Sequence, residues 1–183
     1  IVPEARSIAH LSYSEISELS FFGAKVLHSQ AIRPARRSGI PVRILNTFEP
    51  EHPGTLITAE TRESHKTVKA LAAIKNMSLI TIEGPGMAGI PGMAGRTFSA
   101  VGRTETNVLM ISQASSEQSI CFVIPTPDVS KVVRSLETEL IREIERRDLE
   151  QIRAEDEVVV LAVVGAGMKG TPGVSGRIFG AMG

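Results

Sequence analysis

The sequence predicts an α+β fold, and three observations lead to this prediction. Apolar runs of strand type, such as residues 77–84 and 119–125, alternate with segments whose apolar residues recur at helical spacing. Residues 106–113 and 119–125 are separated only by a short polar turn, as in an antiparallel pair. A glycine-rich segment with its preceding strand occurs twice, 81 residues apart. The order strand, helix, strand, strand, helix, and then the next unit, predicts a ferredoxin-like (βαββαβ) arrangement with the opening of a second unit.

The composition allows a sizeable core and excludes several kinds of protein. The chain has 183 residues, 42% of them hydrophobic, and a formal net charge of zero. No basic stretch dominates, so we expect no nucleic-acid partner. Cys121 is the only cysteine and lies in an apolar run, which excludes an intrachain disulfide and favours a buried thiol. With one cysteine and four scattered histidines, the sequence shows no metal-ligand spacing.

The sequence does not indicate a membrane protein. The longest apolar run, Val158 to Met168, is too short to cross a bilayer, and no signal peptide is visible. We therefore expect no membrane partner and a cytoplasmic location. The chain begins at Ile1 and stops abruptly at Gly183, which suggests a piece of a longer protein.

The first 60 residues predict a small α/β piece. Ser12 and Glu15 have the spacing of a capping box, which predicts a helix that ends near Gly23. Gly39 is expected to stop a second helix. The expected elements are a helix from Ser12, a helix over residues 29–37, a strand over 41–47 and, after a connector rich in turn residues, a short strand before residue 58.

The rest of the chain alternates strands with helices. Residues 64–76 predict a short amphipathic helix. Residues 127–154 predict a long helix of mixed charge, which we interpret as a solvated face. The other expected elements are strands at 77–84, 106–113, 119–125 and 157–165, and a helix at 94–102.

The glycine-rich segment contains a literal GxGxxG at Gly84, Gly86 and Gly89, which raises the question of dinucleotide binding. In a dinucleotide-binding fold the helix begins inside the glycine motif, but here Pro91 and Gly92 would break a helix that began there. Glu105 lies about where a dinucleotide-binding fold would place its ribose-binding acid, so the position of this residue does not exclude the motif. The next elements decide the question, because two turn-linked strands follow instead of the parallel strand of a βαβ unit. A Rossmann oxidoreductase is therefore disfavoured.

The repeat supports another interpretation of the glycines. The 81-residue offset pairs identical residues from Gly84 with Gly165 to Phe98 with Phe179, and it pairs Arg96 with Arg177. Bare backbone between a strand and a helix lets a small ligand approach, and the amides at the helix start favour a carboxylate, as in a zwitterionic amino acid. Alternatively, the loop only packs against a neighbouring unit, and spacing alone does not decide between the two.

Several stretches resemble one known family. The βαββαβ unit with its glycine-rich first loop resembles an ACT domain, a regulatory module that binds amino acids. Residues 18–58, which contain FGAKVLH and PGTLI, are similar to the end of the catalytic domain of aspartate kinases. GAGMKGTPGVSGRIFGAMG resembles the second ACT unit of that family. The resemblance covers essentially the whole chain in the same order.

The resemblance implies an organisation and an activity. Residues 1–60 would be the end of an amino-acid-kinase catalytic domain, residues 64–154 a first ACT domain with flanking helices, and residues 155–183 the start of a truncated second ACT domain. The family makes 4-phospho-L-aspartate from L-aspartate with ATP and Mg²⁺, the first step toward lysine, threonine and methionine. ISQASSEQSICFVIP is most similar to the threonine-sensitive members, including bifunctional aspartokinase–homoserine dehydrogenases. The implied partners are a threonine or lysine effector and further copies of the chain, paired through ACT domains.

The resemblance also implies an effector site. Gln113 matches a glutamine implicated in the threonine response, and Asn107 matches a polar position that several ACT domains use for effector. The residues that match the stretch around the effector are Gly89, Ile90, Gly92, Met93 and Ala94. Without the resemblance, Asn107 and Gln113 would be interpreted as a turn residue and an exposed strand residue.

The chain also departs from the family pattern. The lysine- and glycine-rich phosphate-binding motif is absent, so we assign no catalytic residue and expect neither a cofactor on this piece nor kinase activity from it alone. The second ACT unit stops before its own effector strand. The alternative is a free-standing, amino-acid-binding regulatory subunit without catalysis. Residues 1–58 favour the kinase, because a dedicated sensor has no use for them.

Overall fold

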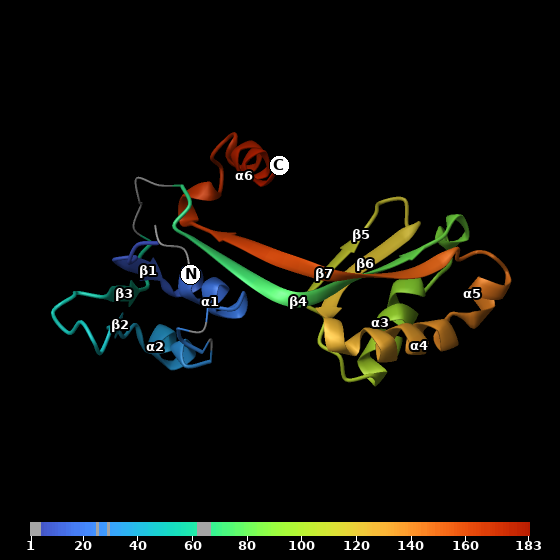
Figure 1. The fold of residues 1–183 in the computed structure, drawn as a ribbon, viewed down its shortest axis with the longest axis horizontal. Helices are drawn as coiled ribbons and strands as arrows, with labels where there is room; N and C mark the ends of the chain where they lie inside the picture. The colour runs from blue at the N-terminus through green and yellow to red at the C-terminus, as the bar shows by residue number, and fades with distance from the viewer. Residues whose placement is uncertain (1–4, 25, 29, 62–66) are drawn as a thin grey trace. The chain divides into compact units, whose positions relative to one another are not determined.

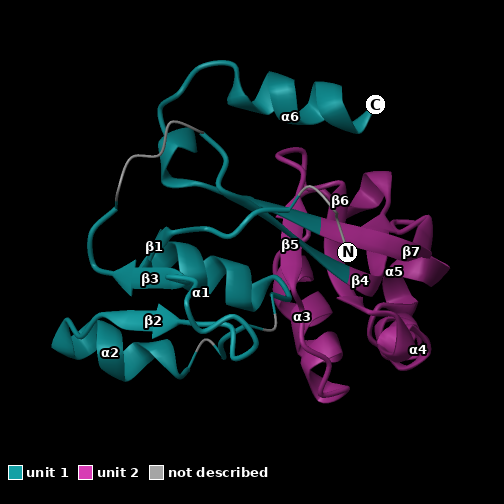
Figure 2. Cartoon of the chain, turned by 60° about the vertical axis from the view of Figure 1, so that its left-hand side comes forward, with its two compact units in different colours: residues 1–74, 161–183 teal, residues 75–160 magenta. Residues whose placement is uncertain are grey.

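The computed structural model describes residues 5–24, 26–28, 30–61 and 67–183, and the chain forms two compact units. Unit 1 contains residues 1–74 and 161–183, and unit 2 contains residues 75–160 (Figure 2). The division falls inside two long strands, β4 (Ala70–Glu83) and β7 (Gln151–Val164). A separate hydrophobic core forms in each unit.

The N-terminal part of unit 1 is a small mixed sheet with two helices. Its elements are β1 (His10–Ser12), α1 (Tyr13–Phe21), α2 (Ile32–Ser38), β2 (Val42–Ile44) and β3 (Thr55–Thr58). β3 is the middle strand, parallel to β1 and antiparallel to β2 (Figure 1). Leu11, Ile16 and Ile57 are buried in its core. As predicted, this piece combines helices with a sheet.

The predicted signals at the two helix ends are present. Ser12 Oγ accepts a hydrogen bond from the Glu15 amide at 3.2 Å, and a Glu15 carboxylate oxygen accepts one from the Ser12 amide at 2.8 Å. Gly39 follows α2 with a φ of 66°, the left-handed conformation that ends many helices. α2 begins at Ile32, later than predicted, and residue 29 lies outside the described residues.

Unit 2 has the predicted ferredoxin-like architecture. The strand order of its sheet is β5 (Met110–Gln113), β6 (Ser119–Pro125), β4, β7, and β6 is antiparallel to both of its neighbours. Helices α3 (Met93–Arg103) and α4 (Val129–Glu139) pack on one face of this sheet, and a short helix, α5 (Ile141–Glu145), follows α4 (Figure 1). Phe122 is 1% exposed in the resulting core and meets Phe98 of α3 edge to face, with 5.6 Å between ring centroids.

The helix predicted over residues 64–76 is wrong for the described part of that range. β4 begins at Ala70, and residues 64–66 lie outside the described residues. From Ala70 to Lys75, half-buried and exposed side chains alternate with the period of a strand. The amide of Lys69, just before β4, donates a hydrogen bond at 2.9 Å to the carbonyl of Val164, the last residue of β7. Pairing with a second strand therefore outweighs the helix propensity of the alanines.

The helix predicted over residues 127–154 is too long. α5 ends at Glu145, and Arg147 has a φ of 60°, which a continuing helix cannot accommodate. Residues 151–154 belong to β7, and the Glu150 amide donates to the Glu83 carbonyl at 2.9 Å. β5 is shorter than the predicted strand, because it begins only at Met110.

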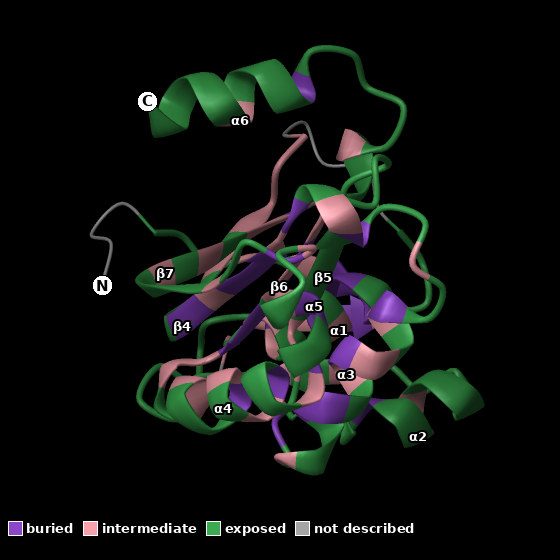
Figure 3. Cartoon of the chain, turned by 90° about the vertical axis from the view of Figure 1, so that its right-hand side faces the viewer, coloured by how far each residue is buried: buried purple, intermediate pink, exposed green. Residues whose placement is uncertain are grey.

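The sequence repeat is also a structural repeat. β4 and β7 are each 14 residues long, and each is followed by a 3₁₀ turn, η1 (Pro85–Met87) or η3 (Ala166–Met168). The next helix is α3 in the first repeat and α6 (Val174–Met182) in the second. The residues before these helices, Gly92 and Gly173, have φ values of 82° and 78°. The two repeats differ in burial, since α6 is exposed along most of its length (Figure 3).

Each unit combines parts of both repeats. In unit 2, Gly84 follows β4 and lies against residues 148–150, which precede β7. In unit 1, Gly165 follows β7 and lies against residues 67–69, which precede β4. The backbone hydrogen bonds of Glu150 to Glu83 and of Lys69 to Val164 are equivalent under the same 81-residue offset. The glycine loop of one repeat is therefore held by the segment that leads into the strand of the other.

Candidate functional site

A hollow of about 290 Å³ lies beside the glycine loop of unit 2. The loop after η1 and the first turn of α3 form one side, and the end of β5 with the β5–β6 turn forms the other. The lining residues are Met87, Gly89, Ile90, Pro91, Gly92, Met93, Ala94, Gly95, Gln113 and Glu117. The hollow thus joins the predicted loop to a strand end that is remote from it in sequence.

The structure brings together six of the seven residues predicted for an effector site. Those that line the hollow are Gly89, Ile90, Gly92, Met93, Ala94 and Gln113. Asn107 does not line it, because it is exposed and precedes the first residue of β5. Glu117 also lines the hollow, although it is not among the predicted site residues. The signal that could find Glu117 is the short polar turn after Gln113, which returns the chain beside the end of that strand.

The glycines of the loop have two different structural roles. Gly89 and Gly92 adopt left-handed φ values of 75° and 82°, and a Cβ at either position would meet nothing within 4 Å. Gly84 has an extended backbone, and close packing explains why a glycine is needed there. A Cβ at this position would lie 2.3 Å from the Asp148 carbonyl oxygen. The first pair leaves bare backbone along the hollow, whereas Gly84 closes the loop entry against the chain before β7.

The N-terminus of α3 lies at the hollow. Its N-cap is Gly92, which provides no side-chain cap, and the Arg96 amide donates to the Gly92 carbonyl at 2.9 Å. The amides of Met93, Ala94 and Gly95 belong to the first turn, where amides lack intrahelical acceptors. Together with the helix dipole, they favour an anionic group at this end of the helix.

Acceptor groups lie across from these amides. A Glu117 carboxylate oxygen accepts a hydrogen bond from the Gly89 amide at 3.2 Å. Glu117 is exposed, with a φ of 57° in the β5–β6 turn. Gln113, the last residue of β5, adds a side-chain amide that can both donate and accept. The hollow therefore offers backbone donors on one side, and a carboxylate and an amide on the other.

Arg96, in the first turn of α3, is held by acidic side chains of unit 2. Its Nη1 lies 2.6 Å from Glu143 Oε1, and its Nε lies 3.1 Å from Glu139 Oε1. The hydrogen bonds to Glu143 and then Glu139 raise the pKa of Arg96, and the hydrogen bond from Arg96 lowers the pKa of Glu143. Because the guanidinium is already paired, we assign the role of anion donor in the hollow to the backbone amides.

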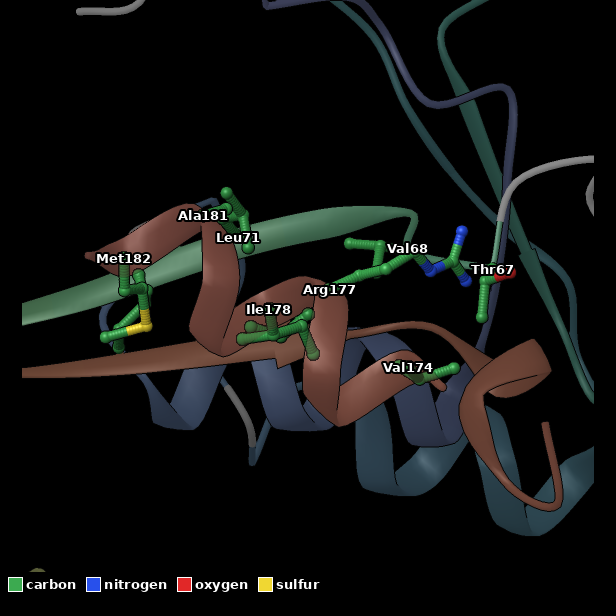
Figure 4. Close-up of a pocket in the computed structure, with 10 residues that line it drawn as sticks. Thr67, Val68, Leu71, Val174, Arg177, Ile178, Ala181 and Met182 are labelled. Carbon is green, nitrogen blue, oxygen red and sulfur yellow. The ribbon is translucent and has the colours of Figure 1, made fainter. Parts of the chain in front are cut away.

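Unit 1 contains a larger hollow, of about 630 Å³, beside α6 (Figure 4). It is lined by Thr67, Val68, Leu71, Leu161, Val163, Val174, Arg177, Ile178, Ala181 and Met182. Under the 81-residue offset, six of these residues correspond to side chains buried in the core of unit 2, namely Ile80, Ile82, Met93, Ala100, Val101 and Leu149. This surface has the chemistry of a core face, and little in it would recognise a polar ligand.

A buried ion pair lies at the second glycine loop, within unit 1. The side chains of Glu15 and Lys69 are 6% and 7% exposed, and their charged atoms lie 2.9 Å apart. The same carboxylate accepts hydrogen bonds from the amides of Ser12 at 2.8 Å and Ala166 at 3.2 Å. Burial raises the pKa of Glu15, but these hydrogen bonds and the Lys69 charge together hold it below its ordinary value. With its oxygens fully engaged, Glu15 is a structural group.

Within the part of the chain that the structure describes, no group of three or more His, Cys, Asp or Glu side chains is arranged to hold a metal ion. Over the same residues, every helix is too short or too polar to cross a membrane.

The fold of unit 2 is of the ACT type. The family model described as ACT domain matches residues 80–140, and the model described as amino acid kinase family matches residues 1–46. The first match covers most of unit 2, including the loop, α3, β5 and β6. The second covers β1, α1, α2 and β2.

Similarity to known proteins extends over the whole chain. The chain is 44% identical over 190 residues to the chloroplastic bifunctional aspartokinase/homoserine dehydrogenase of Daucus carota, and the match covers 99% of this chain and 20% of that protein. It is 39% identical over 182 residues to the bifunctional aspartokinase/homoserine dehydrogenase of Haemophilus influenzae, with 100% and 22% covered. The chain thus spans about a fifth of the length of these relatives.

Solved structures agree with these relatives. The aspartate kinase of Clostridium acetobutylicum has a TM-score of 0.84 at 29% identity, covering 100% of this chain and 41% of that one. Aspartokinase III of E. coli, in complex with lysine and aspartate, has a TM-score of 0.71 at 27% identity, covering 100% and 39%. The chain therefore corresponds to the C-terminal region of an aspartokinase, with an ACT domain, which confirms the resemblance to this family. The threonine-sensitive type stays a prediction.

Proposed function

We propose that this chain is the regulatory region of an aspartate kinase, and that the hollow of unit 2 binds an amino-acid effector that inhibits the enzyme. The observation that carries the proposal is the arrangement of the α3 amides opposite Gln113 and Glu117 around one hollow. In the complete enzyme, ATP and L-aspartate would react to 4-phospho-L-aspartate, and ATP and Mg²⁺ would be bound by the rest of the protein. Similarity to aspartokinases over the whole chain supports this assignment.

The hollow suits a zwitterionic ligand. The amides at the start of α3 would hold the ligand carboxylate, which a helix N-terminus favours by about 0.3–1 kcal/mol. Glu117 would exchange its hydrogen bond with the Gly89 amide for one with the ligand ammonium group. Gln113 would contact the polar side chain of the ligand, and its amide suits the hydroxyl of threonine, which both donates and accepts. We therefore propose threonine in preference to lysine.

A free-standing regulatory subunit is the alternative function. The regulatory subunit of aspartate kinase from Thermus flavus shares the fold, with a TM-score of 0.54 at 23% identity, over 63% of this chain. The match of residues 1–46 to the amino acid kinase family favours the kinase instead. The cytoplasmic location expected from the sequence stays a proposal, and the Daucus carota relative is named chloroplastic.

Replacing Gln113 by Ala should weaken threonine binding by about 1–3 kcal/mol, because a buried polar group of the ligand would lose its partner. The measurement is calorimetric titration of the 183-residue chain with threonine and with lysine, together with a thermal melt of each variant. Asn107→Ala is the matched control, since Asn107 lies outside the hollow and should leave the affinity unchanged. Unchanged threonine affinity in folded Gln113→Ala would contradict the assignment, and tighter binding of lysine by the wild type would contradict the choice of effector.

We also propose that copies of the chain pair through their ACT domains. β5 and β7 are the end strands of the unit 2 sheet, and Met110, Ile111 and Val159 on them are each more than half exposed, at 51%, 54% and 52%. End strands with exposed apolar side chains pair readily with another chain. Light scattering at micromolar concentration should give at least twice the mass of one chain, whereas a monomeric mass would contradict the pairing.

A further inference from the structure

The side chain of Arg96 connects the first turn of α3 to the end of α4 and to α5. Its Nη2 donates to the Glu139 carbonyl at 2.6 Å and to Glu143 Oε2 at 3.2 Å, besides the ion pairs with both side chains. Arg103, two turns further along α3, holds the other Glu139 oxygen at 2.6 Å. A guanidinium can make several such bonds in one plane, which a lysine ammonium cannot. This fork-shaped side chain therefore holds the start of α3 together with Met93, which is buried in the core of unit 2.

Met87, which is buried, and Ile90, which packs against the core of unit 2, anchor the loop before α3, but its glycines add no side-chain contact. Gly89 and Gly92 have no side chains, and a Cβ at either position or at Gly95 would meet nothing within 4 Å. Gly92 provides no side-chain cap for α3. The exit of the loop therefore depends on the helix into which it leads, and Arg96 is the residue whose amide closes the first turn onto the Gly92 carbonyl at 2.9 Å.

The entry of the loop is held by the same part of unit 2. The Gly86 amide donates to the Asp148 carbonyl at 3.0 Å. The amides of Asp148 and Leu149 in turn donate to the Glu143 carbonyl, at 2.9 and 3.2 Å. Glu143 is thus the shared anchor, because its side chain holds Arg96 at the loop exit and its carbonyl holds the segment at the loop entry.

We propose that Arg96 is a positioning residue for the effector loop, and that with Glu143 it sets where the loop amides lie relative to Gln113 and Glu117. This inference rests on the proposed function, because the positioned loop is the proposed effector site. Arg96 does not line the hollow, so it acts on the ligand only through the backbone that it anchors.

The second repeat provides a matched control. Arg177 occupies the position equivalent to Arg96, in α6, and it is exposed. Among the residues that the structure describes, Arg177 forms no ion pair with an acidic side chain. Removing its charge changes the net charge of the chain by the same amount as removing that of Arg96, but leaves the loop of unit 2 untouched.

The test compares Arg96→Gln, Arg96→Lys and Arg177→Gln in the whole 183-residue chain, titrated with threonine and with lysine. We expect Arg96→Gln to bind its preferred amino acid about tenfold more weakly, within the range that residues remote from a ligand reach. Arg96→Lys should bind almost as weakly as Arg96→Gln, since lysine restores the charge but not the planar set of hydrogen-bond donors. Arg177→Gln should bind like the wild type. Wild-type affinity in folded Arg96→Gln would overturn the proposal.

Amide hydrogen exchange of the ligand-free chain gives a second readout that does not depend on binding. Exchange over residues 86–95 should speed up in Arg96→Gln and stay unchanged in Arg177→Gln. If the wild type bound neither amino acid, the proposed function would fail, and the exchange rates alone would decide whether Arg96 positions the loop. Unchanged exchange in Arg96→Gln would then overturn the positioning role. Should Arg96→Gln fail to fold, Glu143→Gln removes the same ion pair and keeps the side-chain size.

Discussion

Glu15→Ala should lower the free energy of unfolding of unit 1 by about 3–5 kcal/mol, the usual cost of removing one partner of a buried ion pair. The substitution leaves Lys69, whose side chain is 7% exposed, without its counter-ion. It also removes the acceptor of two amides, that of Ser12, the N-cap residue of α1, and that of Ala166, which begins η3. One side chain therefore holds a helix start, a buried lysine and the second glycine loop.

Tyrosine fluorescence can follow this loss in unit 1 alone. Tyr13 is the only tyrosine, and the chain has no tryptophan. It is 4% exposed in α1, and its hydroxyl donates to the Ile40 carbonyl at 2.7 Å. Urea unfolding followed at Tyr13 thus reports on unit 1. Glu18→Ala, one turn further along α1 at an exposed position, is the control and should stay within about 0.5 kcal/mol of the wild type. A similar, small effect for Glu15→Ala would refute the structural role of the pair.

The pH dependence of unit 1 follows from the same carboxylate. The pKa of Glu15 is lower in the folded chain than in the unfolded chain, because its hydrogen bonds and Lys69 outweigh burial. Its contribution to stability is therefore fully present above the ordinary glutamate pKa of about 4.3 and is lost as the pH falls through the lowered value. In Glu15→Gln, the urea midpoint of unfolding, followed by Tyr13 fluorescence, should fall less on acidification than it does in the wild type.

Gly84→Ala should destabilise unit 2 by about 2–4 kcal/mol, through overpacking and the loss of hydrogen bonds. The new Cβ would lie 2.3 Å from the Asp148 carbonyl oxygen, 2.6 Å from Leu149 Cα and 2.9 Å from the Glu150 amide nitrogen. All three atoms are backbone, so no side chain can rotate away. Relief requires the chain before β7 to move, which breaks the bonds of Gly86 to Asp148 and of Glu150 to Glu83.

Circular dichroism with the Tyr13 signal separates the two units in this experiment. The helix signal of Gly84→Ala should show an earlier transition, while the transition at Tyr13 in unit 1 stays in place. Gly102→Ala is the matched control, since a Cβ in that part of α3 meets nothing within 4 Å. Gly102→Ala should leave the free energy of unfolding unchanged or raise it by up to about 1 kcal/mol, because alanine is favoured over glycine inside a helix. Equal stability of Gly84→Ala and Gly102→Ala would show that the close approach at Gly84 is not required.

Short-range signals explain most of what the sequence predicts correctly. The capping box joins Ser12 to Glu15 within one helical turn, so both partners appear in one short window. Gly39 ends α2 through its own backbone conformation. The pair β5 and β6 is joined by a turn of a few residues, and its antiparallel pairing follows from that spacing.

Long-range pairing explains the errors. Residues 70–76 have the composition of a helix, and only pairing with β7, far along the chain, makes them a strand. The sequence predicts that residues 151–154 continue the preceding charged helix, but they form the start of β7, which pairs with β4. The loop glycines of the candidate site are visible as a local pattern. Glu117 is not, because its place beside Gly89 depends on how a hairpin turn meets a loop in the folded unit.

The buried carboxylate of Glu15 also has a consequence for synthesis on the ribosome. Its last donor, the Ala166 amide, lies 151 residues further along the chain. At about 5–20 residues per second, translation needs roughly 8–30 s to supply it. During this time α1 and the nascent residues of β4 must remain unaggregated without their final partners. We therefore expect the N-terminal segment to need chaperone protection while it is being made, and slower elongation between residues 75 and 160 to lower the soluble yield.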